Sequence, residues 1–269
     1  MCKVFVLISA AVALISVFCG GLSLWLLPLV FLGCLAALIL LVVLMIIVAA
    51  LLVDTSKPIE KVYPLSHISC NAIADFLIFF GMMKPEISGL EKIPEDRRFL
   101  MVSNHRSAAD PMIIKYCLMK QRIGFISKPS NMALPVLGKM AYGAGFLAID
   151  RENDRNALKT IITAANYLKK GICSICIFPE GTRSRDGKLL PFHAGSFKTA
   201  QKAGAPLVIA CCVGTDTVKK NFLKLRPSKL RFDVLEVLDE EQVKAMSSSQ
   251  LAEYSRELIG RHIDEVSEA

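Results

Sequence analysis

Two common catalytic and nucleotide-binding signatures are missing from this sequence. It contains no G-x-S-x-G nucleophile elbow, which excludes the usual serine-hydrolase motif, and no G-x-x-x-x-G-K-[ST] phosphate-binding loop. Residues 143–148 fit a G-x-G-x-x-A dinucleotide pattern, but this pattern precedes a predicted strand instead of following one. Aromatic residues make up only 7% of the chain and are mostly Phe in apolar runs, so the sequence does not favour a nucleic-acid-binding protein.

Charged side chains are absent from residues 4–53. As one helix, this apolar run would extend about 75 Å, more than two crossings of a hydrocarbon layer about 30 Å thick. A cleaved signal peptide is the competing interpretation, because Lys3 and the apolar residues behind it resemble the start of one. The run continues far past any plausible cleavage site, however, so residues 1–53 are predicted to be a retained transmembrane anchor.

Three helix-breaking residues interrupt the apolar run, namely Gly20, Gly21 and Pro28. They favour a transmembrane hairpin with one helix over about 4–26, a second over about 30–53, and both ends on one side of the membrane. A single long tilted or re-entrant span is the alternative arrangement.

The charge of the remaining chain is basic. All 24 acidic residues and every Lys or Arg except Lys3 lie beyond residue 53, and Lys57 and Lys61 follow the apolar run directly. A basic domain beside a membrane segment favours anionic lipid partners and a cytoplasmic location. We therefore predict an integral membrane protein whose soluble domain lies on the cytoplasmic face of a bacterial inner membrane or of the endoplasmic reticulum.

The nine cysteines are an odd number, and several lie within apolar runs. This usage is typical of buried, reduced cysteines that pack as small hydrophobic residues. Cys173 and Cys176 form a C-x-x-C pair, but no second pair or histidine cluster accompanies them, so neither a metal site nor redox chemistry is predicted.

The chain beyond the anchor divides into two predicted parts. Residues 54–84 comprise a linker over 55–64 and a membrane-proximal apolar helix over 65–83. Residues 85–269 form one domain in which short apolar strands alternate with helices. The predicted strands are 86–90, 99–104, 124–127, 145–149, 173–178, 206–213 and 230–238, and the predicted helices are 111–120, 131–141, 154–170, 195–203 and 249–265. This alternation predicts an α/β fold with a largely parallel sheet flanked by helices.

A histidine and an aspartate follow the second predicted strand, in the sequence NHRSAADP over residues 104–111. Proline is favoured in the first turn of a helix, so Pro111 places Asp110 at or next to the helix start and His105 in the loop before it. A short loop can then fold back until the carboxylate reaches the imidazole, which would fix the tautomer and raise the basicity of the other ring nitrogen. By itself the H-x4-D spacing is a weak signal, and an ordinary capping Asp beside a solvated His is the alternative.

A denser polar motif, FPEGTRSR over residues 178–185, follows the apolar strand at 173–178. Active sites of α/β sheets lie at the carboxyl ends of strands, and the two guanidinium groups here suit phosphate oxygens. The three remaining histidines, His67, His193 and His262, have no acidic partner at comparable spacing and are interpreted as structural or surface residues.

Together these motifs resemble the glycerolipid acyltransferase family, whose members include the 1-acylglycerol-3-phosphate acyltransferases. Residues 104–110 match its H-x4-D block, residues 145–151 are similar to its second block, residues 178–183 match its third, and residues 205–208 resemble its fourth. The resemblance spans residues 99–210, about half of the chain beyond the anchor.

The resemblance implies roles for individual residues. His105 would be the catalytic base and Asp110 its partner. Glu180, Gly181, Thr182 and Arg183 would bind the acceptor, Arg151 would help to hold its phosphate, and Lys128 is a further candidate for that contact. Backbone N–H groups at the helix start after His105 are expected to stabilise the oxyanion.

The implied reaction transfers an acyl group from acyl-CoA or acyl-ACP to the sn-2 hydroxyl of 1-acylglycerol 3-phosphate and gives phosphatidic acid. It requires no metal and no prosthetic group; a carrier protein is a possible partner and nucleic acid is not. Another lysophospholipid, a lyso-aminolipid or glycerol 3-phosphate could instead be the acceptor. A non-catalytic membrane scaffold is the alternative from a different class of protein.

Overall fold

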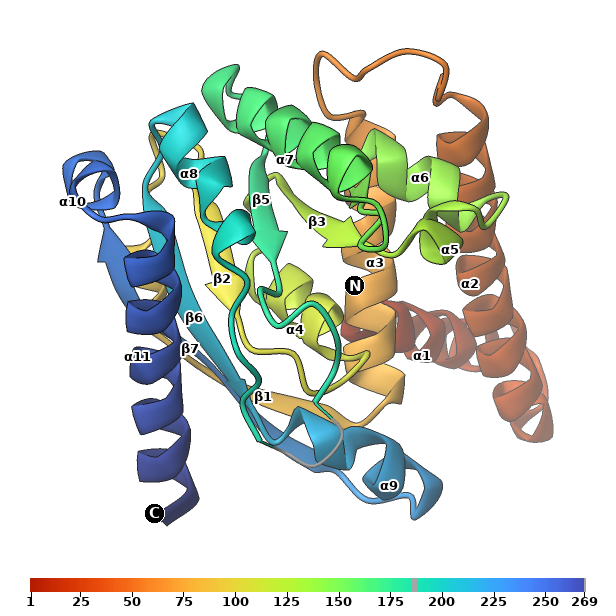
Figure 1. Cartoon of the computed structure of the whole chain (residues 1–269). Coiled ribbons are helices and arrows are strands. Elements are labelled where there is room, and N and C mark those ends of the chain that lie inside the picture. The colour runs from red at the N-terminus through yellow and green to blue at the C-terminus, as the bar shows by residue number, and fades with distance from the viewer. Residues whose placement is uncertain (185–187, 269) are drawn as a thin grey trace.

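A computed structural model of the chain describes residues 1–184 and 188–268; Arg185 of the second polar motif lies outside them. The polypeptide begins with three apolar helices, which flank one side of an α/β domain (Figure 1). These helices are α1 (Cys2–Phe18), α2 (Leu27–Leu51) and α3 (Pro64–Phe80), with a short 3₁₀ helix (Leu24–Leu26) before α2. Both helices of the predicted hairpin and the predicted apolar helix after the linker are present, but α1 ends at Phe18 and does not reach residue 26.

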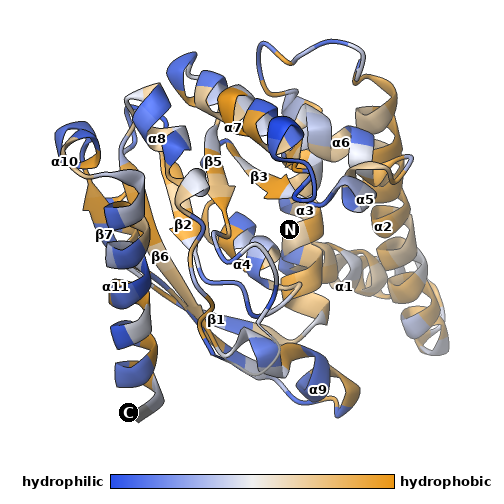
Figure 2. Ribbon diagram, viewed as in Figure 1, coloured by the Kyte–Doolittle hydropathy of each residue, from blue (hydrophilic) through white to orange (hydrophobic). Residues whose placement is uncertain are grey.

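The break between α1 and α2 falls at the predicted glycines. Gly21 adopts a φ of 69°, which favours glycine, and Pro28 lies in the first turn of α2. The segment Leu24–Leu51 is long and apolar enough to cross a membrane. At 17 residues, α1 extends only about 25 Å, less than the hydrocarbon thickness. Both helices consist mainly of hydrophobic residues (Figure 2), and many of their large apolar side chains are exposed, which indicates association with a membrane.

Seven strands form one sheet in the order β1-β7-β6-β2-β5-β3-β4. All neighbouring strands are parallel except β6 and β7, which run antiparallel. The prediction of a largely parallel sheet is therefore confirmed. The strands are β1 (Met83–Ser88), β2 (Leu100–Ser103), β3 (Ile123–Ser127), β4 (Leu147–Ala148), β5 (Ser174–Ile177), β6 (Leu207–Val213) and β7 (Ser228–Leu238).

The helices of the domain cover both faces of this sheet. They are α4 (Asp110–Cys117), α5 (Pro129–Met132), α6 (Leu137–Gly143), α7 (Asp154–Lys169), α8 (Lys198–Ala203), α9 (Val218–Leu223), α10 (Glu240–Ala245) and α11 (Ser248–Glu268). The predicted helix over 131–141 is in fact two helices, because Pro135 between them has no N–H to donate. Helices α9 and α10, of six residues each, were not predicted.

Two apolar clusters, one on each face, hold the sheet between its helices. Leu100 and Ile175 pack under α7, α8 and α11, whereas Met101 and Cys176 pack against α4 on the other face. Adjacent residues of β2 and β5 thus enter opposite clusters, so both strands are buried on both sides. This burial fixes the carboxyl ends of β2 and β5 side by side.

Candidate active site

The two polar motifs meet at one edge of the sheet. The loop with His105 follows β2, and residues 178–184 follow β5, its parallel neighbour. Two hydrogen bonds join the segments: the His105 N–H donates to Glu180 Oε1 at 2.6 Å, and the Ser184 N–H donates to the His105 carbonyl at 3.0 Å. Residues 75 positions apart in the sequence, His105 and Glu180, therefore belong to one site.

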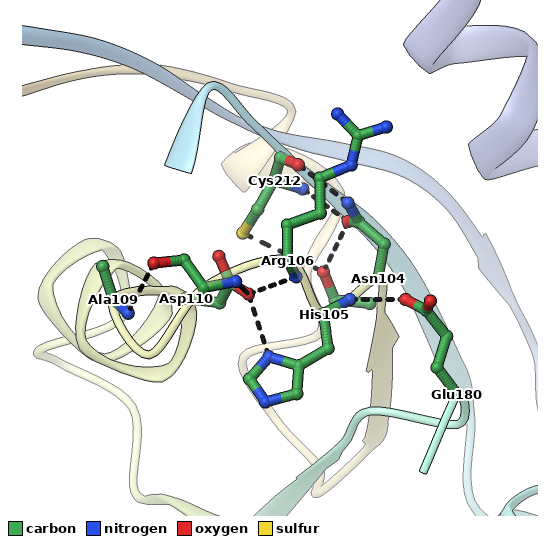
Figure 3. Close-up of polar contacts among 9 residues, drawn as sticks. Asn104, His105, Arg106, Ala109, Asp110, Glu180 and Cys212 are labelled. Atoms are coloured by element: carbon green, nitrogen blue, oxygen red, sulfur yellow. Dashed lines mark hydrogen bonds and ion pairs between the residues drawn. The ribbon is translucent and has the colours of Figure 1, made fainter. Parts of the chain in front are cut away.

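The imidazole of His105 is paired with the carboxylate of Asp110 (Figure 3). Nδ1 lies 2.9 Å from Asp110 Oδ2, and the Asp110 side chain is fully buried whereas that of His105 is 18% exposed. In the neutral imidazole, donation from Nδ1–H to this carboxylate leaves the lone pair on Nε2, at the other side of the ring. Within the described residues Nε2 has no hydrogen-bond partner, so it is available to accept a proton.

The carboxylate of Asp110 also shapes the loop that carries its partner. Its Oδ2 accepts hydrogen bonds from the N–H groups of Arg106 and Ser107, each at 2.8 Å. Asp110 begins α4 and Pro111 follows it, as the sequence predicts. One carboxylate oxygen thus holds both the imidazole and the backbone behind it.

These contacts overturn part of the expected oxyanion site. The N–H groups of Arg106 and Ser107 are bound to Asp110, that of Ala109 donates to Ser107 Oγ, and that of Asp110 donates to the Ser107 carbonyl. Backbone donors that are already engaged in these bonds are not free to bind an oxyanion.

An aromatic stack supports the imidazole. The ring of Phe178 lies parallel to that of His105 with centroids 4.3 Å apart, and Phe125 and then Phe146 continue the column behind it. Stacking restricts rotation of the imidazole about its side-chain bonds. The position of Phe178, directly after a buried strand, was the signal in the sequence, but its contact with His105 depends on the pairing of β2 with β5.

Asn104 anchors the start of the loop over residues 104–109, called the catalytic loop for the role predicted for His105. Its amide donates to the Cys212 carbonyl and accepts from the Cys212 N–H, both at 2.8 Å, and it is fully buried. This two-bond clamp ties the end of β2 to the end of β6. Sequence reasoning missed it, because the partners are 108 residues apart and the sequence does not reveal that the strands are neighbours.

Glu180 is buried and holds two backbone segments. Oε1 accepts from the His105 N–H and Oε2 accepts from the Leu190 N–H at 3.0 Å, and only 3% of the residue is exposed. Burial raises the pKa of Glu180, and these two hydrogen bonds act against the rise. The geometry makes Glu180 a residue that positions His105; its predicted contact with an acceptor stays a prediction.

The rest of the third motif turns toward solvent. Gly181 has a φ of 73°, a conformation that favours glycine, and a Cβ at this position would lie 2.9 Å from Nε2 of the exposed His193, whose ring would have to shift. Thr182 and Arg183 follow with exposed side chains. Arg183 is therefore exposed to solvent and precedes Ser184, whose N–H is hydrogen-bonded to the His105 carbonyl.

Lys128 and Arg151 lie at the same edge of the sheet as Arg183. Lys128 follows β3, which pairs with β5, and Arg151 follows the short strand β4, which pairs with β3; both side chains are exposed. The three cations therefore stand at the carboxyl ends of consecutive strands, with Lys128 and Arg151 farther from His105. Such a row is suited to an anionic group. Among the residues that the structure describes, no group of three acidic, histidine or cysteine side chains could hold a metal ion.

Comparison with known proteins agrees with the geometry. Residues 84–213 match the family model described as Acyltransferase. The 1-acyl-sn-glycerol-3-phosphate acyltransferase of Escherichia coli is 32% identical over 201 residues, 72% of this chain and 81% of that protein. The Haemophilus influenzae protein of the same name is 29% identical over 197 residues, 71% of this chain and 81% of its own.

A protein of the same fold has a crystal structure. The crystal structure of the 1-acyl-sn-glycerophosphate (LPA) acyltransferase PlsC from Thermotoga maritima superimposes with a TM-score of 0.65 over 99% of this chain and 98% of that one, at 22% identity. The family model and these relatives define the chain as an acyltransferase. The chain belongs to the family of the 1-acyl-sn-glycerol-3-phosphate acyltransferases, which are O-acyltransferases.

Proposed function

We propose that the protein acylates the sn-2 hydroxyl of 1-acylglycerol 3-phosphate and so produces phosphatidic acid. The observation that carries the proposal is the His105–Asp110 pair, buried at its carboxylate end and open at Nε2, beside a row of cations. The relatives in Escherichia coli and Haemophilus influenzae, named for this activity, support the choice of acceptor.

The reaction is a direct transfer in which Nε2 of His105 takes the proton of the acceptor hydroxyl as its oxygen attacks the thioester carbonyl. The tetrahedral intermediate collapses by breaking the carbon–sulfur bond, and the departing thiolate takes the proton from Nε2. Asp110 stabilises the imidazolium that exists between these steps. The products are an ester and a free thiol, and neither a metal nor a prosthetic group takes part.

The phosphate of the acceptor would be held by the row of cations. Arg183 stands on the segment that is hydrogen-bonded to the catalytic loop, so its guanidinium can bind a phosphate while the neighbouring hydroxyl faces His105. Lys128 and Arg151 lie farther along the same edge and would attract the anion or contact the donor's phosphates. Acyl-CoA or acyl-ACP would supply the thioester.

A panel of acceptors and donors tests this function. Detergent-solubilised full-length protein would be incubated with labelled acyl-CoA or acyl-ACP and with lysophosphatidic acid, glycerol 3-phosphate or lysophosphatidylcholine, with His105→Ala as the background. We expect phosphatidic acid from lysophosphatidic acid at a rate at least tenfold above the other acceptors. A preference for lysophosphatidylcholine would contradict the proposed acceptor, and no product from any pair would contradict the enzyme activity.

The hairpin of α1 and α2 would anchor the enzyme with its domain at the cytoplasmic leaflet. Lys57 and the basic domain behind it support this orientation. Reporter fusions that are active only in the cytoplasm or only outside it, placed after residue 26 and after residue 57, would test it. A cytoplasmic signal after residue 57 is expected, and an external one would overturn the orientation.

A further inference from the structure

Helix α9 and the turn after it expose apolar side chains that do not belong to the N-terminal hairpin. Phe222 is 49% exposed, Leu223 is 74% exposed and Leu225 is 80% exposed; the two leucines are about as exposed as Trp25 and Leu51 of the hairpin, at 77% each. Large side chains gathered in this way on a soluble domain indicate a binding surface. We call residues 218–226 the α9 segment.

Hydrogen bonds and backbone conformation hold the α9 segment in the arrangement that exposes these side chains. The Arg226 N–H donates to the Asn221 carbonyl at 2.9 Å, and the Asn221 amide donates to Ser228 Oγ at 3.2 Å, which ties the turn to the start of β7. Leu225 has a φ of 52°, a conformation that non-glycine residues rarely adopt. The backbone therefore holds Leu225 outward although a hydrophobic side chain gains nothing from water there.

Cations surround the exposed apolar residues. The segment contains Lys219, Lys220, Lys224 and Arg226, all exposed, and no acidic residue occurs between positions 218 and 232. Lys229 of β7 pairs with Lys84 of the edge strand β1, which extends the positive surface. Lys side chains around a hydrophobic tip match a membrane whose headgroups are anionic, because the charges meet phosphates while the tip enters the acyl region.

The α9 segment adjoins the apolar N-terminal helices. The carboxyl end of α3 exposes four large apolar side chains, those of Phe76, Leu77, Phe79 and Phe80. Two residues later, the Met82 carbonyl accepts a hydrogen bond from the Ser228 N–H, three residues after Leu225. Figure 1 shows α9 at the same lower side of the molecule as the end of α3, and Figure 2 shows both polar and apolar residues on α9.

The α9 segment is also close to the catalytic loop in the fold. It follows β6, whose Cys212 is clamped to Asn104, the neighbour of His105, and β6 is parallel to β2. From these placements we propose that the α9 segment is a second membrane contact, which inserts Phe222, Leu223 and Leu225 into an anionic leaflet and turns the carboxyl edge of the sheet toward it.

Fluorescence quenching tests the insertion without relying on catalysis. The chain has one tryptophan, Trp25, so a full-length Trp25→Phe/Leu223→Trp variant reports on the α9 segment alone. Trp25→Phe/Leu158→Trp is the matched control, because Leu158 is 48% exposed on α7, at the opposite side of the domain from α9 in Figure 1. Both variants would be reconstituted into phosphatidylcholine vesicles with phosphatidylglycerol and brominated acyl chains.

We expect brominated lipid to lower the tryptophan fluorescence of the Leu223→Trp variant at least threefold and to leave the fluorescence of the control almost unchanged. Equal quenching of the two variants would overturn the insertion. A change in emission only on addition of acyl carrier protein would identify a protein-docking surface instead and would also overturn it. Omitting phosphatidylglycerol, or adding Lys219→Gln/Lys220→Gln/Lys224→Gln, should at least halve the quenching; no change would overturn the role assigned to the cations.

The effect of membrane contact on acyl transfer is measured separately, and this measurement rests on the proposed function. Phe222→Ser/Leu223→Ser/Leu225→Ser should lower acyl transfer to lysophosphatidic acid in vesicles about tenfold and leave transfer in detergent micelles within twofold. Loss in both media, or in neither, would contradict the orienting role. Failure of the proposed function would instead show as an inactive wild type, while the quenching result would stand.

Discussion

Two histidine–aspartate pairs of nearly the same geometry lie in the described part of the chain. His105 approaches Asp110 to 2.9 Å in the loop after β2, and His262 of α11 approaches Asp233 of β7 to 2.8 Å. The histidine side chains are 18% and 20% exposed, and the aspartate side chains are 0% and 4% exposed. Distance and burial therefore do not distinguish the pair that we propose to be catalytic from the pair that we interpret as structural.

The ring nitrogen that is bound does separate them. His105 binds Asp110 through Nδ1 and keeps Nε2 open, whereas His262 binds Asp233 through Nε2, the far end of its ring. The surroundings differ as well: Asp233 accepts from Ser88 Oγ at 2.6 Å and lies 3.4 Å from the Arg231 guanidinium, so it joins β1, β7 and α11. Asp110 instead orders the loop that carries its own histidine.

The largest contrast is expected between Asp110→Asn and Asp233→Asn. An amide at Asp110 can donate to Nδ1, which would place the imidazole proton on Nε2 and remove the base. We expect a fall in kcat of about 10²–10⁴-fold for Asp110→Asn and a change within twofold for Asp233→Asn. Steady-state acyl transfer measures both, and equal losses would erase the distinction.

A smaller effect is expected from Glu180→Gln. The amide can accept from only one of the two N–H groups that Glu180 binds, so the catalytic loop would be less well positioned. We expect kcat to fall about tenfold with KM nearly unchanged. Glu236→Gln is the control and should retain full activity, because it alters a carboxylate of β7 that accepts, among the described residues, only from the hydroxyl of Tyr254 on α11. A rise in KM without a fall in kcat would return Glu180 to a role in acceptor binding.

The structural pair should affect stability and not the reaction. His262→Ala removes a partly buried, charge-assisted bond between α11 and β7, which we expect to cost about 1–2 kcal/mol of unfolding free energy. Thermal unfolding in detergent would show a midpoint a few degrees lower. His105→Ala should lower the midpoint less, and the reverse order would contradict the assignment.

A third histidine, His67, lies next to the cation of Lys115, and this contact predicts that the stability of the folded protein depends on pH. The buried Lys115 ammonium lies 3.2 Å from His67 Nδ1, and burial lowers the pKa of Lys115 to about 8 and that of His67 to about 4. The unfolded chain binds the Lys115 proton up to its ordinary pKa, so the stability of the folded protein increases between about pH 8 and 10.5. Below about pH 8, Lys115 is protonated in both the folded and the unfolded protein, so its buried charge lowers the free energy of unfolding by a constant amount.

Lys115→Met removes that cost. We expect the variant to be about 1–2 kcal/mol more stable than wild type at pH 7, with the difference shrinking above pH 8. Unfolding curves of both proteins at pH 7 and pH 9.5 would measure it. A variant less stable than wild type at pH 7 would indicate that the ammonium has further stabilising partners.

The local sequence predicted the His105–Asp110 pair. The contacts around the pair depend on which strands are neighbours in the sheet, and the local sequence does not show this. The five-residue spacing of His105 and Asp110 and the proline after them were enough to predict the folded-back loop. The clamp between Asn104 and Cys212 depends on which strands are neighbours, which no local pattern reveals. The contact of His262 with Asp233 has the same origin, because it needs α11 to lie across β7.

Some helix boundaries could be predicted from the sequence and others could not. The end of α1 before Gly20 and the start of α2 at Leu27 follow from residues that break helices, and the gap between α5 and α6 could have been predicted from Pro135. Helix α9 could not be predicted from periodicity, because six residues are too few and its exposed apolar side chains conflict with a buried stripe.

Acyl transfer from labelled acyl-CoA to lysophosphatidic acid by His105→Ala and His262→Ala, measured side by side, tests the central claim most directly. If Nε2 of His105 is the base, His105→Ala should lose about 10²–10⁴-fold in rate while His262→Ala stays within twofold of wild type. Comparable rates in the two variants would contradict the assignment of His105 as the catalytic base.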